Sequence, residues 1–194
     1  MLIARLGVRS LTVLSIAAVG FLSLACEALA SSATPGPTLP RNVIVSLTAV
    51  SRLFPDITRE ASTGRNLTAT GDPKATRMVI YGVDAGSKKV TLTVDQYRSA
   101  RDASSAYQHA VQKSQSVPGF KLIPVANLGQ QTFAGSVTND AETHIGLGLL
   151  EDKLIVGATL AGYDATSDNT AKLVALARMQ AVAAKKAVGP SGRR

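Results

Sequence analysis

Cysteine and tryptophan are almost missing from this sequence, and their scarcity limits what the folded chain can contain. There is one cysteine, Cys26, and no tryptophan among 194 residues. A chain with one thiol cannot close an intramolecular disulfide or build a cysteine-rich zinc site. Aromatic residues make up only 4% of the chain, so we expect a core of Val, Leu, Ile and Ala.

Histidine is also scarce, which limits the metal and acid–base chemistry open to the chain. His109 and His144 are the only two histidines, and neither has a partner at the spacing of a metal or catalytic motif. The sequence contains no phosphate-binding Gly-Lys loop and no Gly-x-Ser-x-Gly nucleophile motif. We therefore expect no catalytic residue, no cofactor and no metal site.

The first 30 residues have the pattern of an export signal. Arg5 and Arg9 precede an uncharged apolar run at residues 11–25. At about 15 residues, this run is short for a bilayer core, which needs roughly 20 helical residues. The pattern therefore favours a signal peptide at residues 1–30 over a permanent transmembrane helix.

Two processing routes for this signal stay open. Ala28 and Ala30 occupy the small-residue positions that a signal peptidase recognises, and cleavage after Ala30 would release a soluble chain. Alternatively, residues 22–26, Leu-Ser-Leu-Ala-Cys, resemble a bacterial lipobox in which Cys26 would be lipidated. Two acyl chains on Cys26 would anchor the protein to a membrane. The expected location is therefore periplasmic or secreted, or membrane-anchored if Cys26 is modified.

Composition after the signal predicts one domain between two short flanking segments. Residues 31–41 are rich in Ser, Thr and Pro, which predicts a flexible linker. Residues 42–190 have the length of an ordinary single domain. Residues 191–194 form a short tail that ends in two arginines.

The mature chain is basic, and this charge suggests a class of partner. The full sequence has a net charge of +8, and removal of Arg5, Arg9 and Glu27 with the signal leaves +7. Such an excess favours anionic envelope components or an acidic protein partner. The Lys and Arg residues are scattered and not interleaved with aromatics, so nucleic acid is not expected as a partner. Contact with a membrane is expected only through the signal or lipidation, and the sequence does not indicate an oligomeric state.

Hydrophobic periodicity predicts an α+β fold. Alternating apolar residues predict strands at 76–82, 90–95, 120–125, 131–138, 143–150 and 153–160. Helical spacing predicts a short helix near 47–54, a long helix that begins near Ser99 and ends before Val117, and a second long helix at 167–188. The polar residues 59–74 predict a loop. We expect an antiparallel sheet of five or six strands with two long helices packed on it, and Leu173, Leu176 and Met179 facing that sheet.

One surface of small residues is the candidate binding site, and we call it the small-residue platform: His144, Gly146, Gly148 and Gly157. Strand alternation places the first three on one face, and Gly157 interrupts the following strand. Glycine within a strand costs stability and commonly marks a close approach of another backbone. Either a helix packs on these glycines, or the sheet coils strongly there, or a ligand or partner binds a flat surface.

A short motif after the first long helix carries a family resemblance. Residues 128–133 read Leu-Gly-Gln-Gln-Thr-Phe, and paired strands follow. This stretch is similar to small exported bacterial lipoproteins and sensor-type extracellular domains, which often carry Leu-Gly-x-x-Ala-Phe at this place. Thr132 stands here where the pattern has alanine. The resemblance covers roughly residues 97–160, and it implies an α+β fold and an extracytoplasmic location but no catalytic residue.

These observations favour an exported domain, secreted or envelope-anchored, that binds a ligand or has a structural role without catalysis. The ligand is not identified by the sequence. One alternative is an envelope enzyme whose acids, Asp95 or Glu142, act on a bound ligand. Another is a secreted inhibitor that acts through its surface. A cleft that closes around two or more acids would favour the enzyme.

Overall fold

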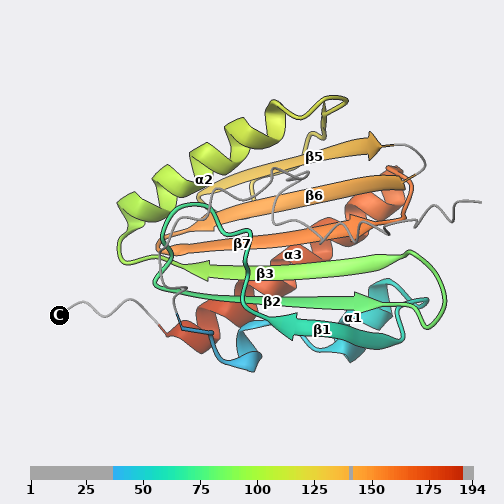
Figure 1. Ribbon diagram of the computed structural model, residues 1–194, viewed down its shortest axis with the longest axis horizontal. Coiled ribbons are helices and arrows are strands. Elements are labelled where there is room, and N and C mark those ends of the chain that lie inside the picture. The colour runs from blue at the N-terminus through green and yellow to red at the C-terminus, as the bar shows by residue number, and fades with distance from the viewer. Residues whose placement is uncertain (1–36, 140–141, 190–194) are drawn as a thin grey trace, which may run out of the picture.

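The strands form a single antiparallel sheet in the order β1-β2-β3-β7-β6-β5-β4 within the computed structural model, which describes residues 37–139 and 142–189 (Figure 1). The strands are β1 Arg59–Gly64, β2 Ala75–Gly82, β3 Lys89–Gln96, β4 Lys121–Leu122, β5 Gln131–Asn139, β6 Glu142–Glu151 and β7 Leu154–Ala161. The helices are η1 Arg41–Val43, α1 Leu47–Leu53, α2 Ala100–Gln115 and α3 Ser167–Val188. Signal residues 1–30, with Cys26, Ala28 and Ala30, and tail 191–194 lie outside the described residues.

The predicted α+β fold with an antiparallel sheet is confirmed, but the sheet has seven strands instead of five or six. The additional strand is β1, in a region expected to be a loop. Five of its six residues are exposed, and its pairing with β2 shifts register between Glu60 and Ser62. A polar strand at a sheet edge has no buried face, so it shows no alternation of apolar residues. Strand β4 is shorter than expected, covering only two residues.

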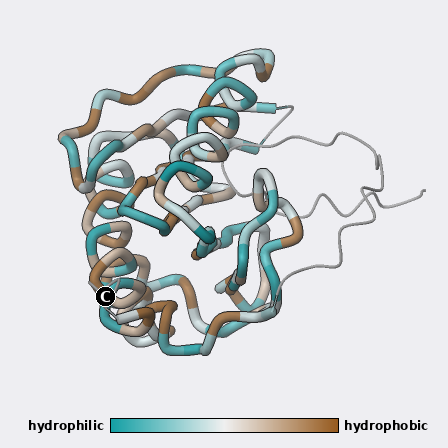
Figure 2. Tube along the Cα trace, turned by 90° about the vertical axis from the view of Figure 1, so that its left-hand side faces the viewer, coloured by the Kyte–Doolittle hydropathy of each residue, from teal (hydrophilic) through white to brown (hydrophobic). Residues whose placement is uncertain are grey.

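The two long helices lie on opposite faces of the sheet. Helix α3, together with α1 and η1, covers the face that carries Leu92, Leu147 and Val156, which we call the α3 face. Helix α2 packs on the other face, the α2 face, against Ile155 and Leu150. Figures 1 and 2 show this arrangement from two directions, with α3 behind the sheet in Figure 1. Both faces of the strands are therefore used for packing.

Side-chain caps fix the starts of the helices where the sequence predicts them. The Ser99 hydroxyl accepts a hydrogen bond from the backbone N–H of Asp102 at 3.1 Å, which starts α2. The Thr166 hydroxyl accepts from the N–H of Asn169 at 3.2 Å, which starts α3. Gly189 follows α3 with a φ of 78°, a conformation that favours glycine. None of the helices in residues 37–139 and 142–189 is long and apolar enough to cross a membrane.

Helix α3 contributes a buried face to the core, although one residue of that face is not the expected one. Leu173 and Leu176 are buried as predicted. Met179, expected to face the sheet, is instead 37% exposed. The neighbouring Gln180 is fully buried, and its amide donates to the carbonyl of Val43 at 2.7 Å and accepts from the N–H of Val45 at 3.0 Å. The Gln180 side chain therefore joins α3 to the segment around η1 through two hydrogen bonds.

The described part of the segment expected to be a linker is packed on the sheet. Thr38 forms a bridge with Thr76 of β2, and Leu39 is only 6% exposed within the core. The Arg41 guanidinium donates to Glu60 at 2.6 Å and to the Tyr81 hydroxyl at 2.8 Å. One apolar residue and one paired arginine therefore join residues 38–41 to the sheet.

Candidate functional site

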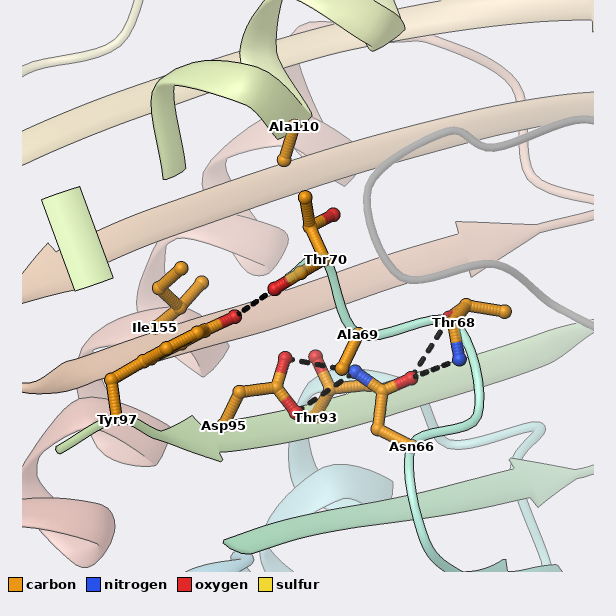
Figure 3. Close-up of a pocket in the computed structure, with 9 residues that line it drawn as sticks. All are labelled: Asn66, Thr68, Ala69, Thr70, Thr93, Asp95, Tyr97, Ala110 and Ile155. Atoms are coloured by element: carbon orange, nitrogen blue, oxygen red, sulfur yellow. Dashed lines mark hydrogen bonds between the residues drawn. The ribbon is translucent and has the colours of Figure 1, made fainter. Parts of the chain in front are cut away.

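Asp95 is a buried acid on the α2 face, close to the end of β3. The pairing of β3 with its neighbours places it between Thr76 of β2 and Ile155 of β7. Only 5% of Asp95 is exposed. A carboxylate removed from water in this way needs hydrogen-bond donors or an opposite charge. Figure 3 shows the residues that surround it.

Asn66, from the loop between β1 and β2, supplies that donor. Its side-chain Nδ2 donates to both carboxylate oxygens of Asp95, at 3.0 and 2.9 Å (Figure 3). Asn66 is itself held in place, because its backbone N–H donates to the Thr76 hydroxyl at 3.1 Å. Its Oδ1 accepts from the N–H and the hydroxyl of Thr68, at 3.2 and 2.8 Å. These contacts orient the amide toward the acid.

The loop encloses a small cavity above Asp95, which we call the Asp95 chamber. The Tyr97 hydroxyl donates to the carbonyl of Thr70 at 2.6 Å and so ties the loop to the end of β3. The chamber has a volume of about 20 Å³, enough for one water-sized group. Its lining residues are Asn66, Thr68, Ala69, Thr70, Thr93, Asp95, Tyr97, Ala110 and Ile155.

Burial controls the electrostatics of the chamber. It raises the pKa of Asp95 from 3.8 to about 7, and the hydrogen bond from Asn66 offsets only part of this increase. Burial also raises the pKa of Tyr97, and the nearby charge of Asp95 adds to that effect. Near neutral pH, the chamber therefore holds an acid that changes between its neutral and charged forms.

A larger, open groove adjoins the chamber, and we call it the outer groove. It has a volume of about 430 Å³ and is lined by Thr70, Gly71, Asp72, Tyr97, Arg98, Asp102, Ser105, Ala106 and His109. Thr70 and Tyr97 line both spaces, so they form the wall between them. Arg98 and Asp72 lie 3.7 Å apart across an exposed ion pair. The chamber and the groove therefore lie side by side and share two lining residues, and we treat them together as the candidate site.

The small-residue platform lies on the same face of the sheet. Gly148 is paired with Gly157 across β6 and β7, and His144 lies further along β6, opposite Ala161. The Tyr107 hydroxyl from α2 donates to the carbonyl of Gly148 at 3.3 Å. A Cβ on Gly157 would lie 2.4 Å from the Thr93 hydroxyl. At Gly148 and Gly157, the protein's own side chains therefore approach the glycines. Ligand binding on the platform, Gly146 included, stays a prediction.

The structure does not bring together the two acids of the enzyme alternative. Asp95 pairs in register with Ile155, and Ile155 with Leu150, whereas Glu142 stands at the other end of β6. Glu142 instead lies 3.7 Å from His144. His109 is exposed and lines the outer groove. Within residues 37–139 and 142–189, no three His, Cys, Asp or Glu side chains are grouped so that they could hold a metal ion.

Sequence reasoning did not find the partner of Asp95. Asn66 is 29 residues away, and its contact with Asp95 depends on how the loop folds back onto the sheet. The one local signal is Asn66-Leu67-Thr68, a spacing at which an asparagine side chain can accept a hydrogen bond from the backbone two residues later. That signal predicts the turn but not the residue that the turn faces.

Comparison with known proteins gives a structural match without a sequence match. No protein-family model and no curated protein matches the sequence. Three solved chains have a similar structure. One is the extracellular domain of PknH from Mycobacterium tuberculosis, with a TM-score of 0.50 and 10% sequence identity over 71% of this chain and 92% of that domain. The two proteins share a fold. At this identity the match is informative about the fold alone.

Proposed function

We propose that this protein is an exported binding domain, secreted or held in the envelope, that takes a small polar ligand on the α2 face of its sheet. The observation that carries the proposal is the Asp95 chamber beside the outer groove. A buried ionisable group next to an open groove is a common property of ligand sites. The chemistry of the Asp95 chamber and the outer groove therefore favours ligand recognition.

The energetic cost of Asp95 supports this proposal. A buried carboxyl with one amide partner destabilises the folded state at neutral pH compared with an uncharged side chain of similar size. Its neighbours on this face, Thr93 and Ile155, are uncharged. A ligand that makes use of the acid would explain why a residue with this cost stands at the position.

Export is supported by two independent observations. Arg5, Arg9 and the apolar run at 11–25 have the pattern of a signal peptide. The fold is shared with a domain that is extracellular in PknH. Both fit a domain that meets its ligand outside the cytoplasm, as a sensor-type domain would.

Binding is favoured over catalysis by the arrangement of the acids. Asp95 is held by the Asn66 amide, and Glu142 lies at the far end of the sheet. A reaction that needs Asp95 and Glu142 on one substrate therefore has no support from this geometry.

The binding proposal is tested by mapping where low-molecular-weight envelope components contact the exported chain. Amide signals of the processed protein are recorded by two-dimensional NMR before and after addition of the fraction below about 1 kDa from an envelope extract. We expect shifts in residues 66–72 and in α2, and their loss in Asp95→Asn, while Asp164→Asn, which changes an exposed acid, keeps them. Shifts confined to the α3 face, or none, would contradict the proposal.

A further inference from the structure

The position of Asn66 points to the chemical class of the ligand. We propose that the Asp95 chamber binds the primary ammonium group of a small cationic molecule, which displaces the Asn66 amide as the loop at residues 66–72 opens. This inference rests on the binding function proposed above and names the ligand class for the same site.

Asn66 already places a nitrogen where an ammonium group would lie. Its Nδ2 is 3.0 and 2.9 Å from the two oxygens of Asp95, so one NH₂ group is shared between both acceptors. The amide is neutral, whereas an ammonium group carries a positive charge and three donors. A charge-assisted hydrogen bond to a carboxylate is about twice as strong as a neutral one. A ligand amine is therefore a better partner for ionised Asp95 than the residue that occupies the place in the unliganded protein.

The chamber is small. With Asn66 in place it has a volume of about 20 Å³, the size of one water molecule, and the group that the ligand would displace from Asp95 is a single NH₂. An ammonium group therefore fits this position with less movement of the loop than a guanidinium or a quaternary ammonium would need. The remainder of the ligand would lie in the outer groove, whose volume of about 430 Å³ suits a molecule of modest size.

The wall between the chamber and the groove belongs to a loop whose tip is exposed. Thr70 and Tyr97 form it, joined by the 2.6 Å hydrogen bond from the Tyr97 hydroxyl. Leu67, in the same loop, is 80% exposed and so contributes little apolar packing. Gly71 has a φ of 73°, which gives the end of the loop a conformation favoured by glycine. Segments with little buried apolar surface open at a low free-energy cost.

The charges around the site also favour a cation. The chain as a whole has a net charge of +8, yet Asp72 and Asp102 line the outer groove, with Asp95 behind them. Arg98 opposes them from the same groove and pairs with Asp72. An excess of acids in a groove of a basic protein raises the local concentration of cations.

The experiment is a titration of the processed protein with paired probes by calorimetry at pH 8, where Asp95 is ionised. Ethanolamine and glucosamine carry a primary ammonium, and ethylene glycol and N-acetylglucosamine are their neutral counterparts. We expect the amines to bind roughly ten times or more as tightly as the neutral probes. Asp95→Asn should lose this preference, while Asp164→Asn should retain it.

Two variants that release the loop test the displacement of Asn66. Asn66→Ala removes the competing amide, and Tyr97→Phe removes the hydrogen bond to Thr70 while it keeps the ring. Both should bind the amines more tightly than the wild type, by about tenfold for Asn66→Ala. If Asn66→Ala does not fold, the affinity of Tyr97→Phe for the amines tests the proposal by itself.

The outcomes separate this inference from the binding function on which it rests. Equal binding of amines by the wild type and Asp95→Asn, or no amine binding by the wild type and Tyr97→Phe, would overturn the ammonium site. The binding function would still stand if the envelope fraction shifts residues 66–72 and α2. Loss of those shifts as well would remove both.

Discussion

The carboxyl of Asp95 should give the stability of this protein an unusual dependence on pH. Burial raises its pKa from 3.8 to about 7 in the folded state. Between these two values the folded chain keeps a proton that the unfolded chain has released. The free energy of unfolding must therefore fall as pH rises through this window. The shift in pKa corresponds to a stabilisation of roughly 4 kcal/mol. This stabilisation is fully present below about pH 4 and is lost above about pH 7.

Asp56 provides the contrast within the same molecule. Burial alone would raise its pKa, but hydrogen bonds from Lys88 and Tyr163 lower it below its usual value. Its contribution to stability is present at neutral pH and is lost as pH falls through its folded-state pKa. Asp95 thus changes stability with pH in the direction opposite to that of an ordinary paired acid. A variant at position 95 therefore isolates its contribution to the pH dependence of stability.

Asp95→Asn removes the ionisable group and keeps an oxygen that can accept from the Asn66 amide. We expect the variant to be more stable than the wild type above pH 7, by up to roughly 4 kcal/mol, and to differ from it by only about 1 kcal/mol near pH 4.5. Urea unfolding at pH 4.5, 6, 7 and 8 measures both proteins, with Asp164→Asn as the control at an exposed acid. Parallel stability curves for the wild type and Asp95→Asn across this range would refute the reasoning.

Three further predictions concern the core and the N-terminus. Leu176→Ala should lower the free energy of unfolding by about 2 to 5 kcal/mol, because Leu176 is fully buried. The control, Lys186→Ala, changes an exposed residue and should have little effect. Equal effects of the two variants in urea unfolding would mean that α3 does not stabilise the core. Gln180→Ala should cost about 1 to 3 kcal/mol by the same measurement, since it leaves buried backbone groups unpaired, and an unchanged midpoint would show that water replaces the amide. Intact mass of the exported form should begin either at Ser31 or at an acylated Cys26, and a chain that keeps residues 1–30 would contradict the predicted signal peptide.

Apolar patterning in the sequence predicted the strands that have buried side chains. The predicted ranges of β2, β3, β5, β6 and β7 agree with the structure to within a few residues, and in β7 all eight residues are buried. β1 has no buried face, so its polar residues looked like a loop. Met179 and Gln180 show a different limit. Position 180 follows Leu173, Leu176 and Ala177 at helical spacing and so lies within the buried face, but its residue is polar, and hydrophobicity alone pointed to Met179 instead. The hydrogen bonds of Gln180 to the segment around η1 satisfy the buried amide.

The candidate site was harder to predict than the fold, because its contacts join distant parts of the chain. Alternation in β3 places the side chains of Asp95 and Val94 on opposite faces of the sheet, and the sequence already suggested Asp95 as a candidate catalytic acid. Its burial depends on the loop around Asn66 and on Tyr97, neither of which follows a local pattern. The pairing of Gly148 with Gly157, in contrast, follows from the short turn between β6 and β7.

The pairing of β3 with β7 at the centre of the sheet affects how the chain reaches its native state. It joins residues that are roughly 60 to 70 positions apart, from Gln96 with Leu154 to Lys89 with Ala161. Contacts at such separation form slowly, since the intervening chain must be closed into a loop first. During that delay the β2–β3 hairpin has an unpaired inner edge, a surface on which chains can aggregate. Refolding should therefore be slow and sensitive to protein concentration, and a chain that crosses a membrane from its N-terminus cannot complete the sheet before β7 has emerged.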